Sequence, residues 1–132
     1  MAEIKISELS IGDWVNQKMN DGAYQVKWIE REIVGLIKHT GTEEDGSIHL
    51  TAVPLSFIEP IPLTPEILEK NGISKTYESD EYAVYKGEGF NVTEYYTELW
   101  EFERHRNRLM IRNVHQLQHA LRLAGVGKEI EV

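Results

Sequence analysis

The sequence contains no cysteine and no long hydrophobic run. The absence of cysteine excludes disulfides, cysteine-ligated zinc, iron–sulfur clusters and thiol catalysis. No apolar stretch approaches the roughly 20 residues that a membrane helix requires. The first residues include acidic side chains and lack the apolar segment of a signal peptide, so we expect a cytoplasmic protein that does not contact membranes.

Proline is scarce and confined to one stretch, because all four prolines fall between residues 54 and 65. Pro60 and Pro62 cannot donate to a strand ladder, so this stretch is predicted to leave the preceding sheet as an extended connector. A short helix should follow it, with Thr64 as the N-cap and Pro65 at the first helical position.

Positive charge is in deficit, since 22 acidic residues face 14 basic ones and the net charge is −8. Such a balance opposes indiscriminate phosphate binding. The charge is uneven along the chain: residues 73–102 contain seven acidic and two basic residues, whereas residues 103–132 contain three acidic and six basic ones. The last quarter of the chain is therefore locally basic.

Short β-branched and aromatic runs separated by turn signals fill residues 13–53, and they predict a small β-barrel or curled antiparallel sheet. Residues 81–112 again show strand lengths with aromatic alternation, followed by a helix that begins near Asn113. We therefore predict an α+β protein with a β-barrel lobe over residues 1–60. Residues 61–132 should form a short helix, an antiparallel sheet of three or four strands and a C-terminal helix, packed on the first lobe as one cooperative unit.

His115 and His119 stand four residues apart on the predicted C-terminal helix, as paired zinc ligands do in metalloproteases. Gln116 occupies the position of the general base, and its spacing from Asn113 instead indicates a helix-capping pair. On a helical projection the two histidines lie opposite the apolar stripe. We expect a solvated polar face and no metal, with His115 and His119 as weak candidate ligands.

Four arginines fall within nine residues around a predicted turn at residues 105–107. They are Arg104, Arg106, Arg108 and Arg112. If the segment stayed extended, a period of two would place the first three on one side and form a stripe for phosphates or for an acidic protein. Alternatively, the arginines only solvate an exposed hairpin and pair with the acidic residues of the chain.

Aromatic residues on the first strands, Trp14, Tyr24 and Trp28, are candidates for a peptide-binding groove. Aromatic residues in such positions more often belong to a hydrophobic core. The sequence contains no phosphate-binding loop, dinucleotide fingerprint or nucleophile elbow. We therefore expect no enzymatic activity and no cofactor.

Three stretches, SIGDWV (10–15), FIEPIPLTPEILEKNGI (57–73) and IRNVHQLQ (111–118), resemble a family of short uncharacterised proteins from Bacteroides-type gut bacteria and their prophages. The resemblance implies an SH3-like barrel followed by an α+β half, and a mobile-element setting. The family has no assigned activity, so it assigns no catalytic residue. It usually has asparagine where this chain has His119, which further weakens the histidine pair as a ligand set.

Three functional hypotheses follow from the sequence. The first is a non-enzymatic interaction or accessory module that binds a protein through the barrel aromatics or the arginine cluster. The second is a nucleic-acid-associated accessory protein that contacts phosphates through the arginines. The third and least favoured is a metal-dependent hydrolase centred on His115 and His119.

Overall fold

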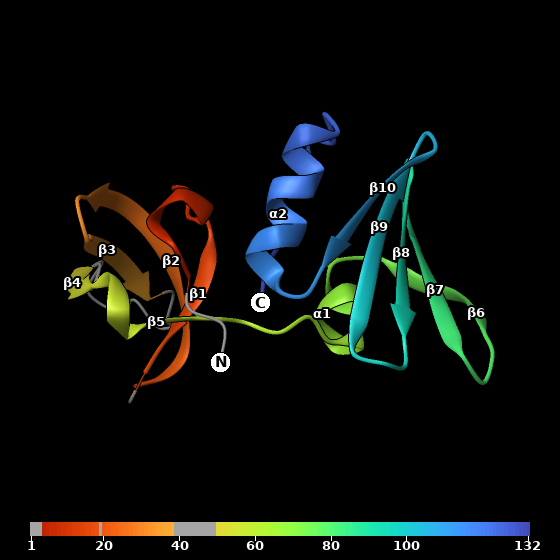
Figure 1. Cartoon of the computed structure of the whole chain (residues 1–132), viewed down its shortest axis with the longest axis horizontal. Coiled ribbons are helices and arrows are strands. Elements are labelled where there is room, and N and C mark those ends of the chain that lie inside the picture. Colours follow the sequence, from red (N-terminus) through yellow and green to blue (C-terminus); the bar gives the residue numbers. More distant parts are fainter. Residues whose placement is uncertain (1–3, 19, 39–49) are drawn as a thin grey trace, which may run out of the picture. The chain divides into compact units, whose positions relative to one another are not determined.

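The computed structural model of the chain describes residues 4–18, 20–38 and 50–132. These residues form two antiparallel five-stranded sheets and two α-helices (Figure 1), so the predicted α+β class is confirmed. The chain divides into two compact units, Met1–Ile61 and Pro62–Val132, each with one of the sheets. Neither helix is long and apolar enough to cross a membrane.

The first sheet has the strand order β4-β3-β2-β1-β5. Its strands are β1 (Trp14–Gln17), β2 (Asn20–Glu30), β3 (Ile33–Lys38), β4 (Leu50–Pro54) and β5 (Ile58–Pro60). The 3-10 helices η1 (Ile6–Glu8) and η2 (Leu55–Phe57) precede β1 and β5. The first strand pairs with the last, but no pairing joins β4 to β5 among the described residues, so the sheet is not closed.

The proline-rich stretch does not leave the first sheet, contrary to the prediction. Its residues Ile58–Pro60 form β5, in which Pro60 lies opposite Val15 of β1. The prediction was wrong because β5 is an edge strand, where a proline that lacks a donor on the outer side removes no ladder hydrogen bond. The stretch joins the second unit at Pro62.

Asn20, Asp21 and Gly22, residues of the types that commonly form turns, lie inside β2. The pairing of β1 with β2 shifts at this point, from Asn16 opposite Ala23 to Gln17 opposite Asn20. The extra residues of β2 form an irregularity in which Gly22 has a φ of +101°, a conformation that favours glycine. The turn-forming residues are therefore used in a strand bulge.

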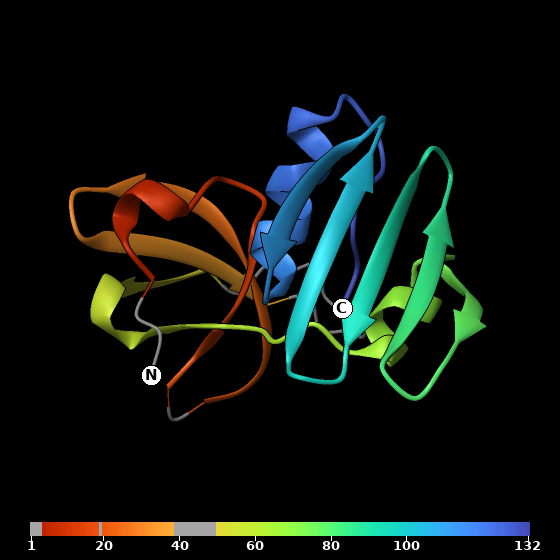
Figure 2. The same cartoon turned by 45° about the vertical axis from the view of Figure 1, so that its right-hand side comes forward.

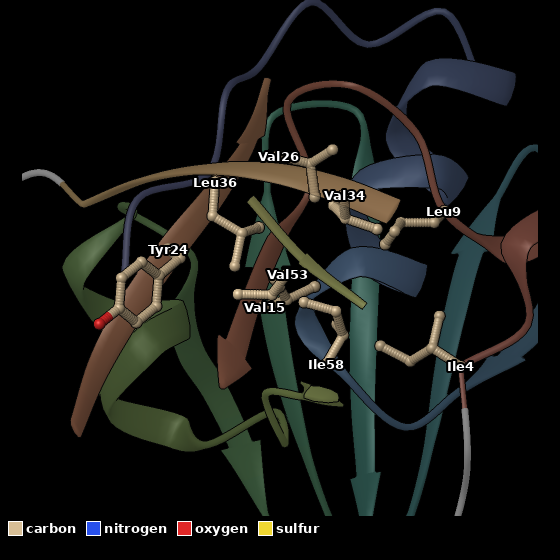
Figure 3. Packing of buried hydrophobic residues seen from close by; sticks show 9 residues of the cluster. All are labelled: Ile4, Leu9, Val15, Tyr24, Val26, Val34, Leu36, Val53 and Ile58. Carbon is tan, nitrogen blue, oxygen red and sulfur yellow. The ribbon is translucent and has the colours of Figure 1, made fainter. Parts of the chain in front are cut away.

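The core of the first unit is a cluster of nine buried residues from the five strands and from the two segments that flank η1 (Figure 3). They are Ile4, Leu9, Val15, Tyr24, Val26, Val34, Leu36, Val53 and Ile58. Most are β-branched or aliphatic residues that fit a pleated surface. Val15, Val26, Val34 and Leu36 are completely buried.

A close contact between neighbouring strands depends on Gly35, which lies opposite Trp28 in the pairing of β2 with β3. A Cβ atom at Gly35 would lie 2.2 Å from Nε1 of Trp28. The indole ring thus occupies the space that a side chain at position 35 would need. Gly35 is required here because of space rather than because of a positive φ.

We predict that Gly35→Ala lowers the free energy of unfolding by about 1–3 kcal/mol, because the added methyl group forces the Trp28 ring out of place. Chemical denaturation monitored by tryptophan fluorescence measures this loss. Gly127→Ala is the matched control, since a Cβ there meets nothing within 4 Å. Equal stability of the two variants would contradict the close contact between Trp28 and Gly35.

The second unit begins with α1 (Pro65–Lys70) and continues through the strands of a second sheet, whose order is β10-β9-β8-β7-β6. The strands are β6 (Ser74–Glu78), β7 (Tyr82–Gly87), β8 (Phe90–Tyr95), β9 (Leu99–Arg104) and β10 (Asn107–Ile111). Helix α2 (Val114–Leu123) follows. Strand β6 is an addition to the predicted sheet.

Both helices begin at the predicted caps. Oγ1 of Thr64 accepts a hydrogen bond from the Ile67 N–H at 3.2 Å, and Oδ1 of Asn113 accepts one from the Gln116 N–H at 3.3 Å. The Gln116 side chain reaches one residue further back than predicted, because its Oε1 accepts from the N–H of Arg112 at 2.7 Å. The role of Gln116 in capping is confirmed, with a different partner.

The two faces of the second sheet differ because buried and more exposed residues alternate along β7, β8 and β9. Tyr85, Val92 and Phe102 lie opposite one another on β7, β8 and β9, and all are buried. We call their side the core face; both helices and the segment after α2 lie along it (Figures 1 and 2). The other side, which we call the open face, has no buried residue in the second unit.

The end of the chain is held against α1. Asn71, the C-cap of α1, donates from Nδ2 to the carbonyl of Glu131 at 2.7 Å and accepts from the Glu131 N–H at 2.8 Å. Its Nδ2 also donates to the Ile67 carbonyl at 2.7 Å. Ile130, beside this contact, is 3% exposed. One side-chain amide therefore joins the end of α1 to a backbone segment 60 residues later.

Candidate functional site

The arginine cluster lies on the hairpin of β9 and β10. The two residues between the strands, His105 and Arg106, have φ values of 49° and 71°. Positive φ at both central residues characterises the type I′ turn, which joins strands with the usual twist. The predicted turn is confirmed, and it is tight enough to reverse the chain completely.

The tight turn separates the arginines that an extended chain would have aligned. Arg104 lies opposite Asn107, and Arg108 lies opposite Glu103, so their side chains leave opposite faces of the sheet. A one-sided stripe of Arg104, Arg106 and Arg108 required an extended segment, and the turn excludes it. Arg106 is exposed in the turn itself, and Arg112 is exposed after β10.

Arg104, on the core face, is bound to the end of α2. Its Nη1 donates a hydrogen bond to the carbonyl of Ala124, the C-cap of the helix. A guanidinium at this position also complements the negative end of the helix dipole. Arg104 is thus a structural link between the hairpin and α2 as well as a source of positive charge.

Arg108, on the open face, is near two carboxylates. Its Nε lies 3.9 Å from Oε1 of Glu101 and 3.8 Å from Oε2 of Glu103. Pairs this long, with an arginine side chain that is 65% exposed, contribute little to stability. They do reduce the net positive charge that Arg108 presents to a ligand.

A groove of about 380 Å³ lies between the hairpin and the C-terminal half of α2. The helix lines it with Ala120, Leu123 and Ala124, and the strands line it with Phe102, Arg104, Asn107, Arg108 and Leu109. His105 of the turn also lies along it. We call this feature the hairpin groove. Its volume is within the usual range for ligand-binding sites.

Two leucines leave the hairpin groove with bare apolar surface. Leu109 is 45% exposed although it lies opposite the buried Phe102, and Leu123 is 85% exposed at the end of α2. The small side chains of Ala120 and Ala124 leave space between these two leucines. The groove therefore has an apolar floor with cationic groups at its hairpin end.

The aromatic residues proposed for a barrel groove do not form one shared surface. Tyr24 belongs to the buried core cluster and is 8% exposed (Figure 3). Trp14 is also 8% exposed, while the half-buried Trp28 covers Gly35. The core interpretation holds for Tyr24. The Lys38 ammonium lies 5.7 Å from the centre of its ring.

The two histidines of α2 do not both lie on a solvated polar face, as the sequence predicted. His115 is 1% exposed, and its ring meets that of His119 edge-on at 5.7 Å. The prediction was wrong for His115 because the buried arc of α2 is wider than its apolar stripe and includes Gln118, which is 8% exposed. Apolar periodicity detects only the apolar part of such an arc.

No group of three or more histidines and carboxylates within metal-binding reach occurs in residues 4–18, 20–38 and 50–132. His39 and His49 lie outside these ranges, and His105 is exposed in the hairpin turn. A catalytic zinc ion requires three protein ligands and an activating carboxylate. His115 and His119 supply two of these groups.

We predict that His119→Ala leaves the heat of zinc titration unchanged, because two imidazoles without a third ligand do not form a closed site. Isothermal titration calorimetry of the wild-type chain and the variant measures the difference. His105→Ala is the control for weak surface binding. Tight zinc binding that is lost in His119→Ala would restore the hydrolase hypothesis.

A polar cluster occupies the α1 end of the core face. Tyr85, completely buried, is hydrogen-bonded to the Glu94 carboxyl, and the Lys75 ammonium lies 5.9 Å from the centre of its ring. Burial, followed by the charges of Glu94 and Glu69, raises the pKa of the Tyr85 hydroxyl to about 12. Burial also raises the pKa of Glu94. The cluster thus favours a protonated phenol as donor.

We predict that this phenol makes stability sensitive to alkaline pH. The folded chain holds the Tyr85 proton more tightly than the unfolded chain, whose pKa is near the ordinary value of 10.0. The contribution is complete below pH 10 and is lost as the pH rises through about 12. Denaturant unfolding across this range should show a smaller loss for Tyr85→Phe than for the wild type. Tyr95→Phe, at a half-buried position, is the control, and a loss in Tyr85→Phe identical to that of the wild type would contradict the assignment.

The hairpin groove was missed by sequence reasoning, although one signal was present. Leu123 follows the apolar stripe of α2 at a position that the stripe does not include, and it is the most exposed large apolar residue described. The contribution of Leu109 could not be predicted, because the face on which it lies depends on the exact position of the hairpin turn.

Comparison with protein-family models, curated proteins and solved structures gives no match for this chain.

Proposed function

We propose that the protein is a non-enzymatic interaction module and that the hairpin groove binds a segment of a partner protein. The observation that supports this proposal is the exposure of Leu109 and Leu123, 45% and 85%, on either side of a concave apolar surface. Isolated exposed leucines are ordinary, but two that flank a groove provide an anchor site for a large apolar side chain.

The positive charge around the hairpin groove determines which kind of partner segment it would bind. Arg104 and His105 line the hairpin end of the groove, Arg106 is exposed in the adjoining turn, and residues 103–132 contain six basic and three acidic residues. A partner segment with an apolar anchor and neighbouring aspartate or glutamate residues would complement this arrangement. We therefore propose an acidic, amphipathic peptide as the ligand.

Nucleic acid is the second candidate, and the geometry favours it less. A phosphate-binding surface requires several cations that follow the backbone of the ligand. Here Arg104 is bonded to Ala124, and Arg108, which also lines the groove, lies near two carboxylates that offset its charge. The groove is concave, and the leucines and alanines that line it beside Phe102 suit an apolar protein side chain better than a row of stacked bases.

We also propose that the first unit is an SH3-like barrel that supports or extends this interaction. Five short antiparallel strands, with the first paired to the last, support that proposal. Trp28 is half-buried in this unit, and its exposed large apolar residues include Ile11, Ile33, Leu50 and Phe57.

The test is peptide selection followed by mutation of the groove. A display library of random peptides, screened on the full chain, should yield sequences with a large apolar residue beside acidic residues. We predict that Leu123→Gln weakens binding of a selected peptide about tenfold, because one buried leucine contributes about 1.5–3 kcal/mol. Glutamine keeps the helix propensity of leucine. Fluorescence polarisation measures the dissociation constant.

Leu50→Gln is the matched control, since Leu50 is 55% exposed on the first unit. Equal effects of the two substitutions would contradict the groove as the binding site. Selected peptides without acidic residues would contradict the charge argument. Salt-sensitive binding of single- or double-stranded DNA or RNA that is lost in Arg106→Ala, with no selected peptide, would favour the nucleic-acid hypothesis.

A further inference from the structure

Three tyrosines form a row across the open face of the second sheet. Tyr77 of β6 and Tyr82 of β7 have ring centres 5.5 Å apart, and Tyr82 and Tyr95 of β8 have ring centres 6.1 Å apart. Tyr82 and Tyr95 are direct partners in the strand pairing, and Leu99 is the next residue in that line. We call Tyr77, Tyr82 and Tyr95 the tyrosine row.

The row is accessible to a ligand. Tyr77 is 52% exposed on an edge strand whose five residues are all exposed, and Tyr82 and Tyr95 are partly exposed. Cross-strand aromatic pairing explains why Tyr82 and Tyr95 stabilise the sheet. It does not require a third ring at the edge, where the sheet offers little apolar surface to cover.

The surroundings of the row are negatively charged. Residues 73–102, which contain all three tyrosines, include seven acidic and two basic residues. Glu81 directly precedes Tyr82, and it contributes to raising the pKa of that phenol, after the larger effect of Tyr77 and the effect of burial. Nζ of Lys75, one of the two basic residues, lies 3.6 Å from Oε2 of Glu78, which offsets its positive charge. An anionic ligand is therefore disfavoured at the row.

We propose that the tyrosine row binds a lysine- or arginine-bearing extended segment of a partner protein. The electron-rich faces of tyrosine rings attract ammonium and guanidinium groups within about 6 Å of the ring centre. Neighbouring carboxylates such as Glu81 and Asp80 add charge complementarity at the same end of the sheet. The site differs from the hairpin groove in face, in charge and in the chemistry of its ligand.

An octa-arginine peptide is a direct probe of this site. Calorimetry at low ionic strength should detect its binding to the wild-type chain and none for a serine peptide of equal length. We predict that the double variant Tyr77→Ala and Tyr95→Ala weakens octa-arginine binding about fivefold or more, given cation–π energies of about 0.5–1 kcal/mol for each ring. The substitutions leave the net charge unchanged.

Two controls separate ring chemistry from general electrostatic attraction. Tyr77→Phe with Tyr95→Phe should retain most of the affinity, because phenylalanine keeps the aromatic face. Tyr96→Ala removes an equally exposed tyrosine outside the row, whose hydroxyl donates to Glu78, and should leave binding unchanged. Circular dichroism verifies that each variant is folded.

The proposal is overturned if the wild-type chain does not bind octa-arginine. It is also overturned if a folded Tyr77→Ala, Tyr95→Ala variant binds as tightly as the wild type, since net charge alone would then explain the attraction. If the double alanine variant does not fold, Tyr77→Ala alone decides in the same way, because Tyr77 is on the exposed edge strand. Leu123→Gln should leave octa-arginine binding unchanged.

Discussion

Side-chain alternation along β7, β8, β9 and β10 is the constraint on which the whole second unit depends. The register that places Tyr85, Val92 and Phe102 on one face also fixes where the helices can pack. The same register sends Tyr82 and Tyr95 to the opposite face. A shift of one residue would exchange the two faces, so the hairpin groove and the tyrosine row depend on the same strand register.

The turn at His105 and Arg106 converts a sequence cluster into two separate chemical environments. Both residues have positive φ, a backbone conformation that is uncommon for residues other than glycine and asparagine. It costs about 1–3 kcal/mol for each residue. The strands that flank the turn compensate for this cost. The result is that Arg104 supports a helix end while Arg108 lies between carboxylates. Local sequence density of arginine is therefore a poor guide to surface charge in this hairpin.

Elements with local chemical signals were predictable. The caps of α1 and α2 depend on Thr64 and Asn113, which act within a few residues, and the core positions of Trp100 and Phe102 follow from alternation. Features that depend on distant partners were not predictable. Strand β6 is exposed throughout and has no hydrophobic periodicity. Strand β5 forms through its pairing with β1, which is distant in the sequence. The groove forms only where Leu109 lies near the end of α2.

The contact of Asn71 with Glu131 has a consequence for the order in which the chain is made. Helix α1 has six residues, too few to be stable by itself, and two of the bonds that terminate it come from a segment 60 residues later. On the ribosome, this segment emerges after every strand of the second sheet. Helix α1 is therefore expected to remain loosely formed until Glu131 has emerged, and its final ordering marks the completion of the second unit.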